Sequence, residues 1–123
     1  MEYEIIDNTL RTRSFNVNFG YKITDVTYWD GVYVVLLSIP NKVDEVDNIY
    51  GVDENGNIIW RIENPIKAFK IDKKEQGYNY FASSVYVNVR LDEGIFIGTT
   101  FFAVKYTFDY KTGKLINKEP SKW

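Results

Sequence analysis

Four glycine-containing turns divide this 123-residue chain into short segments that favour β-strands. Asp30-Gly31 and Asn55-Gly56 supply the residue types that tight hairpins require, because the central positions of such turns adopt positive φ angles. Glu93-Gly94 and Thr112-Gly113 place glycine at equivalent points later in the chain. Between the turns, apolar and polar residues alternate with the period of two that strands impose, and no long helical stripe interrupts them. The pattern predicts an all-β fold.

The alternation predicts strands near residues 14–19, 22–29, 32–39, 48–53, 57–62, 84–91, 94–99, 102–109 and 114–117. The segment from Val32 to Leu37 is apolar at every position, which indicates a central strand covered on both faces. The strand at 84–91 alternates instead, so we expect Val87 and Val89 on its buried face and Tyr86 on its solvent face.

The length and mass, 123 residues and 14.4 kDa, are typical of one domain. Within this single β domain, we interpret residues 22–63 and about 84–120 as two related units of four strands each, an internal repeat. Residues 64–82 form the linker, where Pro65 ends the preceding strand because it has no N–H, and a short helical or irregular segment is expected. The two antiparallel meanders are expected to pack as a small sandwich or an open barrel.

Both units contain a turn that starts at Asp and includes Gly. The matching residues are Gly51, Asp53, Gly56 and Trp60 in the first unit, and Asp109, Thr112, Gly113 and Lys114 in the second, where Asn117 stands in place of the Trp. This signature resembles the blade repeat of PQQ-type and related β-propellers. In such blades the Asp accepts turn N–H bonds, Gly takes a positive φ angle, and Trp docks on the neighbouring blade. Closed propellers have about four to eight blades, so two units would complete a ring only with further chains.

The chain has no Cys and no His, which excludes several classes of active site. Disulfides, thiolate nucleophiles, histidine-based triads and the usual zinc sites all need one of these residues. Carboxylate-pair glycosidases, Lys or Tyr acid/base catalysts and Mg²⁺ or Ca²⁺ sites remain possible in principle. Since nearly all the carboxylates fall at predicted turn tips, we expect a protein that is not an enzyme and that needs no cofactor.

The charge is unevenly divided along the chain. Residues 1–65 contain five basic and eleven acidic residues, a net of −6, whereas residues 66–123 contain ten basic and six acidic residues, a net of +4. The overall charge of −2 gives no reason to expect binding to nucleic acid or to an anionic membrane. The acidic N-terminus does not match a signal peptide, and the longest apolar run is too short to span a bilayer, so we expect a cytoplasmic location.

The segment 41–48 is the most conspicuous polar feature. Three carboxylates, Asp44, Glu45 and Asp47, fall within four residues and would attract a basic partner. An ordinary solvated loop would have the same composition. A Ca²⁺ site is a further alternative, but the glycine and the distal bidentate Glu of an EF-hand loop are missing.

Exposed aromatic residues are the second candidate for binding. Trp29, Tyr78 and Tyr80 are expected to face solvent, where they could form a protein-binding hot spot or stack on sugars. Most of the other aromatic side chains are expected to be core, because aromatics favour strands.

These features favour a non-enzymatic protein-interaction module. In size and composition the chain also resembles small bacterial proteins of polymorphic toxin loci, which implies an immunity protein that masks a basic toxin domain. The alternatives are a small-ligand or carbohydrate-binding module that uses exposed Tyr and Trp, and a subunit of a larger ring. The chain is expected to be a monomer or a small homo-oligomer.

Overall fold

The computed structural model describes residues 2–40, 46–69 and 84–120. Within these ranges the elements are β1 (Glu4–Ile6), β2 (Thr9–Arg11), β3 (Asn16–Asn18), β4 (Ile23–Trp29), β5 (Val32–Leu37), β6 (Ile49–Asp53), β7 (Ile58–Arg61), α1 (Pro65–Ala68), β8 (Tyr86–Asp92), β9 (Ile95–Thr100), β10 (Val104–Phe108) and β11 (Leu115–Pro120). The strands form three antiparallel sheets, ordered β1-β2-β3, β4-β5-β6-β7 and β11-β10-β9-β8. We call these the N-terminal, middle and C-terminal sheets. The predicted all-β fold with two four-stranded meanders is confirmed.

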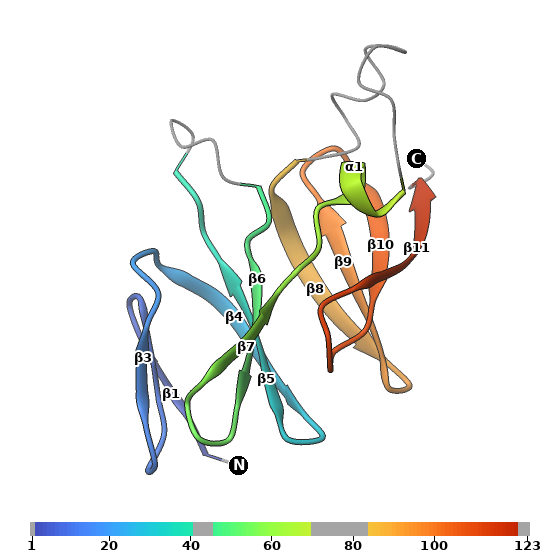
Figure 1. Ribbon diagram of the computed structural model, residues 1–123. Helices are drawn as coiled ribbons and strands as arrows, with labels where there is room; N and C mark the ends of the chain where they lie inside the picture. The colour runs from blue at the N-terminus through green and yellow to red at the C-terminus, as the bar shows by residue number, and fades with distance from the viewer. Residues whose placement is uncertain (1, 41–45, 70–83, 121–123) are drawn as a thin grey trace.

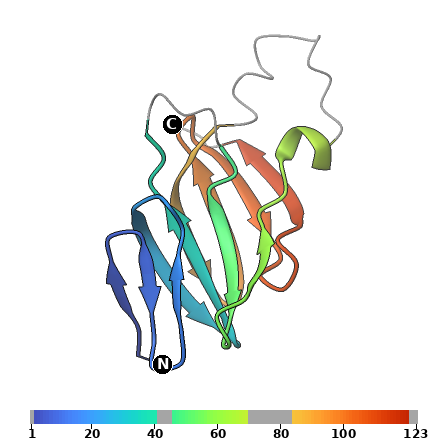
Figure 2. The same cartoon turned by 60° about the vertical axis from the view of Figure 1, so that its left-hand side comes forward.

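The three sheets stack as open layers with the middle sheet between the other two (Figure 1). Figure 2 shows the same stack turned so that the N-terminal sheet comes forward. One buried apolar cluster fills the space between the middle and C-terminal sheets, and a second lies between the middle sheet and the N-terminal sheet. The described part of the chain therefore has two cores, one on each face of the middle sheet.

Strand β5 belongs to both cores. All six residues from Val32 to Leu37 are buried, as the sequence predicts for a strand covered on both faces. The three even-numbered side chains join the cluster shared with the C-terminal sheet, and the three odd-numbered ones join the cluster shared with the N-terminal sheet. This division follows from the alternation of side chains along a strand.

Several side chains tie the middle sheet to the C-terminal sheet, among them Asn48 and Trp60. The buried amide of Asn48, just before β6, accepts a hydrogen bond from the backbone N–H of Tyr86 and donates one to its carbonyl. At the other end, the indole of Trp60 donates to the carbonyl of Tyr110 and lies against Gly113. The two meanders are thus fastened at both ends by polar contacts as well as by the core between them.

The hairpin turns have the backbone geometry that their sequences predict. Positive φ angles occur at Asp30 (45°) and Gly31 (84°), and again at Glu93 (49°) and Gly94 (82°), as two-residue hairpins require. In the other two turns, the side chains of Asp53 and Asp109 accept backbone N–H groups of the residues that follow. The internal repeat and the resemblance to propeller blades remain sequence-based predictions.

The N-terminal sheet is the main departure from the predicted strands. The sequence indicates one strand at 14–19, but β1 and β2 precede β3 and complete a separate layer. These strands are only three residues long, and the turn between β1 and β2 uses Asp7, a non-glycine residue with a φ angle of 55°. Neither feature stands out in a sequence pattern.

The expected orientation of Tyr86 is wrong. A bulge between Tyr86 and Asn88 inserts an extra residue into β8, so that Tyr86 is buried and Val87 is 51% exposed. From Val89 onward the alternation returns, and Val89 is buried as expected.

The predicted linker contains the short helix α1. Its first turn starts at Pro65, and the side chain of Asn64 caps it by accepting the N–H of Ile66 at 3.0 Å. In the parts of the chain that the structure describes, no helix combines the length and apolar character needed to cross a bilayer.

Candidate functional site

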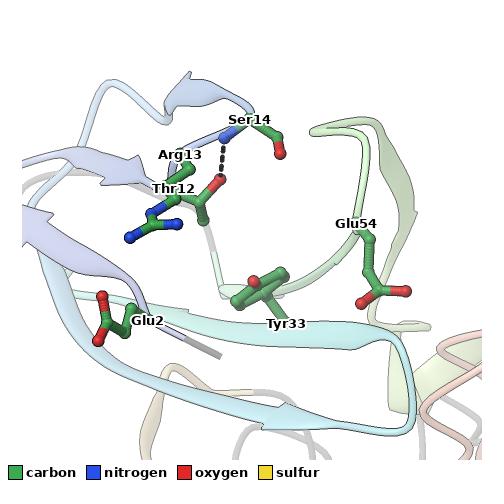
Figure 3. A pocket seen from close by; sticks show the side chains of 6 residues that line it. All are labelled: Glu2, Thr12, Arg13, Ser14, Tyr33 and Glu54. Carbon is green, nitrogen blue, oxygen red and sulfur yellow. Dashed lines mark hydrogen bonds between the residues drawn. The ribbon is translucent and has the colours of Figure 1, made fainter.

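A cleft of about 370 Å³ opens between the N-terminal and middle sheets. Its lining consists of Glu2, Thr12, Arg13, Ser14, Tyr33 and Glu54 (Figure 3). A second, more open hollow of about 620 Å³ shares Glu2, Thr12 and Arg13 with it and continues along β1 and β2 to Glu4 and Arg11. The lining joins residues far apart in the sequence, so the site exists only because the N-terminal sheet covers β5.

One wall of the cleft is the turn between β2 and β3. Thr12 fixes this turn, because its hydroxyl oxygen accepts the N–H of Ser14 at 3.1 Å and that of Phe15 at 3.2 Å. The backbone N–H of Thr12 in turn donates to the carbonyl of Phe15. Arg13 and Ser14 are held at the tip, where their side chains reach the cleft.

Tyr33 forms the floor. Its side chain is only 1% exposed and packs edge-on against Tyr3 and Phe15, with Tyr28 tilted against it at 4.8 Å between ring centroids. Its hydroxyl has no hydrogen-bond partner among the described residues, although Tyr33 lines the cleft. Burial raises the pKa of this hydroxyl, and Glu54 and Tyr3 raise it further. The floor therefore offers a neutral O–H group that no described residue uses.

Glu54 forms the opposite wall from the turn between β6 and β7. One of its carboxylate oxygens, Oε2, accepts the hydroxyl of Tyr28 at 2.7 Å, and this hydrogen bond is the main reason that the pKa of Tyr28 is raised. The other oxygen, Oε1, has no hydrogen-bond partner in the described ranges. The Tyr28 contact orients the carboxylate and leaves one oxygen for a ligand.

Glu2 and Arg13 lie on the same side of Tyr33, across from Glu54 (Figure 3). The register of β1 and β2 pairs Glu4 with Arg11, and continuing it by two residues brings Glu2 opposite Arg13. Each arginine therefore has a glutamate facing it, whereas Glu54 has no basic residue in the lining on its side. The cleft combines acceptors, hydroxyls and a guanidinium around an aromatic floor.

Two carboxylates in one cleft bear on the glycosidase alternative. Glu2 and Glu54 are both exposed, whereas the acid of a glycosidase sits in a less polar setting that keeps it protonated. The arrangement supports binding more directly than acid/base chemistry. Over the described residues, no group of three or more acidic side chains is placed to hold a metal ion.

The predicted acidic site is described only in part. Asp44 and Glu45 lie outside the described residues. Asp47 is half-buried, and both its carboxylate oxygens accept the amide of Asn64, at 3.3 and 3.2 Å. Burial raises the pKa of Asp47, while Asn64, Arg61 and Lys67 act in the opposite direction. Asp47 therefore helps to hold the start of β6 against the segment after β7.

The predicted aromatic site is also described only in part, because Tyr78 and Tyr80 lie outside the described ranges. Trp29 is 39% exposed at the end of β4 and contacts the turn at Gly94. Next to it, Asp30 accepts the hydroxyl of Tyr110 at 2.5 Å. Trp29 pairs with Val32 and so faces the C-terminal sheet, on the opposite face of the middle sheet from the cleft.

The structure does not bring the predicted residues together. Trp29 lies near the end of the middle sheet where β6 finishes, and Asp47 precedes the end where β6 begins. The cleft residues Arg13, Tyr33 and Glu54 were not predicted as a site. In the sequence, Glu54 falls in the predicted hairpin turn at Asn55-Gly56, and Tyr33 falls in the apolar run from Val32 to Leu37.

Fold and site together define a stacked antiparallel β protein with a charged surface cleft. A family described as "Domain of unknown function (DUF7957)" has a sequence model that matches residues 1–120, and the chain belongs to this family. No curated protein and no solved structure matches the chain.

Proposed function

We propose that this chain is a non-enzymatic protein-interaction module that binds a basic partner protein. The observation that carries the proposal is that the acidic half and the basic half of the sequence form different layers of the stack. The residues of the acidic half, 1–65, make up the N-terminal and middle sheets, and the C-terminal sheet comes from the basic half. One side of the stack therefore has an excess of negative charge.

Such a distribution would act mainly on association. A surface of one sign accelerates the encounter with a partner of opposite sign and disfavours partners of like sign. The stacked sheets support this role, because short hairpins and two cores hold the surface in one shape. A rigid surface loses little conformational entropy when it binds.

A bacterial immunity protein is the specific form of this proposal. An immunity protein neutralises a toxin by covering its working surface, and nuclease toxins are basic because their substrate is anionic. The acidic segment with Asp44 and Glu45 and the charged cleft near Glu54 are the surfaces expected to contribute.

The test is to express the chain together with the protein encoded beside it and to look for a complex by size-exclusion chromatography with light scattering. Association rates, measured by stopped flow at increasing salt, should fall steeply. Replacing Asp44 by Asn and Glu45 by Gln should slow association and flatten the salt dependence. The matched removal of two carboxylates from the hairpin between β8 and β9 on the C-terminal sheet, Asp92→Asn and Glu93→Gln, should slow it much less.

The proposal fails if no complex forms or if its association rate is independent of salt. Protection of cells that express the partner would support the immunity form. A complex without such protection would leave an interaction module that is not an immunity protein.

Carbohydrate binding is less well supported by the geometry. Sugar sites usually present an accessible aromatic face, but the exposed Trp29 and the cleft lie on opposite faces of the middle sheet, and Tyr33 presents little more than its hydroxyl. A titration with sugars followed by Trp fluorescence would test it, since binding near Trp29 should change the emission.

A further inference from the structure

We infer that the cleft lined by Arg13, Tyr33 and Glu54 receives a cationic side chain, the guanidinium of Arg or the ammonium of Lys, from the partner. This inference rests on the proposed interaction function and names the chemistry of one contact. It is argued from the acceptors in the cleft, from the charge balance around them and from the size of the space.

Two acceptor oxygens on residues that line the cleft have no hydrogen-bond partner among the described residues. Oε1 of Glu54 is left over because Oε2 is bound by Tyr28, and the Tyr33 hydroxyl oxygen is left over although the side chain is almost fully buried. The Tyr33 hydroxyl is not among the fully buried side-chain atoms that lack a partner, so it stays accessible from the cleft. A guanidinium or ammonium group has several N–H donors and could serve both oxygens at once.

The charges around the cleft favour a cation over an anion. Arg13 and Arg11 have Glu2 and Glu4 facing them across the N-terminal sheet, so the formal charges of these four side chains sum to zero. Glu54 has no such basic neighbour in the lining. The nearby carboxylate of Asp53 is already engaged by the N–H groups of its own turn. The uncompensated charge at the cleft is therefore negative.

The dimensions fit a single side chain. A space of about 370 Å³ is at the small end of ligand sites and holds one extended Arg or Lys side chain with some water. The apolar part of such a side chain would lie along the wall formed by Thr12 and Ser14, and its charged end would reach Glu54 and the Tyr33 hydroxyl.

The experiment uses small probes and does not need the partner. The full chain labelled with ¹⁵N is titrated with N-acetyl-arginine amide and N-acetyl-lysine amide, and binding is followed by NMR shifts of the Arg13, Ser14 and Glu54 amides. The neutral isostere N-acetyl-citrulline amide is the control ligand. The cationic probes should bind weakly but measurably, and the citrulline probe should bind at least about tenfold more weakly, because a charge-assisted hydrogen bond is lost.

Variants locate the site. Glu54→Gln should weaken binding of the arginine probe about tenfold, and Tyr33→Phe, which keeps the ring contacts, should weaken it about threefold. Asp92→Asn, a matched loss of one exposed carboxylate on the C-terminal sheet, should leave binding unchanged. Urea unfolding of each variant checks that the fold is retained.

Three outcomes would overturn the inference. The citrulline probe could bind as well as the arginine probe, Glu54→Gln could have no effect, or inorganic phosphate could shift the same amides more strongly, which would assign the site to anions at Arg13. A fourth arm uses propylguanidine, a free small guanidine with the same single charge: binding much tighter than that of the capped arginine would assign the cleft to a free small molecule instead of a protein side chain. Because these titrations contain no partner, their failure is distinct from failure of the proposed interaction.

Discussion

Asn48 and Tyr86, 38 residues apart in the chain, bond to each other as two paired strand residues would. The Asn48 side chain accepts the Tyr86 N–H at 2.8 Å and donates to the Tyr86 carbonyl at 2.9 Å, and it also donates to the carbonyl of Leu37 at 2.7 Å. A side-chain amide thus continues the hydrogen bonding of the middle sheet into the C-terminal sheet. Because all three bonds are buried, no water can replace them.

Replacing Asn48 by Asp should destabilise the protein strongly. The carboxylate would lose both donor bonds and would face two carbonyl oxygens in a buried site, so we expect a loss of about 3 kcal/mol or more in the free energy of unfolding. Urea unfolding measures it. Asn88→Asp, the same chemical change at an exposed position of β8, is the control and should cost about 0.5 kcal/mol or less. Similar losses in the two variants would contradict the role of Asn48.

Gly51→Ala tests the contact between Gly51 and Trp60. A Cβ at Gly51 would overlap the Trp60 ring, so we expect a loss of about 2 kcal/mol in stability from overpacking. In a Trp60→Leu background the smaller side chain leaves room, and Gly51→Ala should cost much less there. A double-mutant cycle in chemical denaturation gives this coupling, and additive effects would show that the close approach does not matter.

Leu10→Ala tests whether the N-terminal sheet is an integral layer. Leu10 is fully buried in the core between that sheet and the middle sheet, so its truncation should cost about 2–5 kcal/mol. Ile6→Ala, in the neighbouring strand, is the control, since Ile6 is 46% exposed and should cost about 1 kcal/mol or less. Thermal and urea unfolding should rank the two variants in this order. Equal, small losses would mean that the layer contributes little.

The buried hydroxyl of Tyr86 predicts a loss of stability at alkaline pH. Burial raises the pKa of Tyr86 far above its usual value of 10.0 in the folded protein. Above that usual value the unfolded chain releases the proton while the folded protein keeps it, so stability is fully present below about pH 10 and decreases as the pH rises further.

Tyr86→Phe should make this alkaline decrease shallower. At neutral pH the variant should be equally stable or more stable by up to about 1 kcal/mol, because the Tyr86 hydroxyl is buried with no partner among the described residues. Urea unfolding across a pH series measures both effects. An equal pH slope in the two proteins would contradict the raised pKa of Tyr86, and a large loss at neutral pH would show that the hydroxyl has a hydrogen-bond partner.

The sequence predicts the meanders well because their signals are local. Positive φ at Asp30-Gly31 and Glu93-Gly94 follows from residue type, and the burial of Val32–Leu37 follows from an unbroken apolar run. The bulge that turns Tyr86 inward leaves no such signal, because one extra residue changes the register without changing the composition. The N-terminal sheet is not predicted for a related reason, since three-residue strands are too short to show a periodic pattern.

The cleft could not be predicted because it depends on how distant segments meet. Arg13, Tyr33 and Glu54 come from three different strands or turns, and only the packing of the N-terminal sheet over β5 brings them together. The sequence does indicate the excess of acidic residues in residues 1–65. The sequence also overstates how freely the acidic residues of segment 41–48 are available to a partner, because the carboxylate of Asp47 accepts hydrogen bonds from Asn64 inside the fold.

Because β5 contributes alternate side chains to both cores, neither outer layer can detach without exposing half of the same strand. The amide protons of β5 should therefore be the slowest to exchange with deuterium, and their exchange should require the whole domain to open in a single cooperative step. Cellular proteases would then act on either the folded domain or the fully unfolded chain, because no partly unfolded form is populated in between.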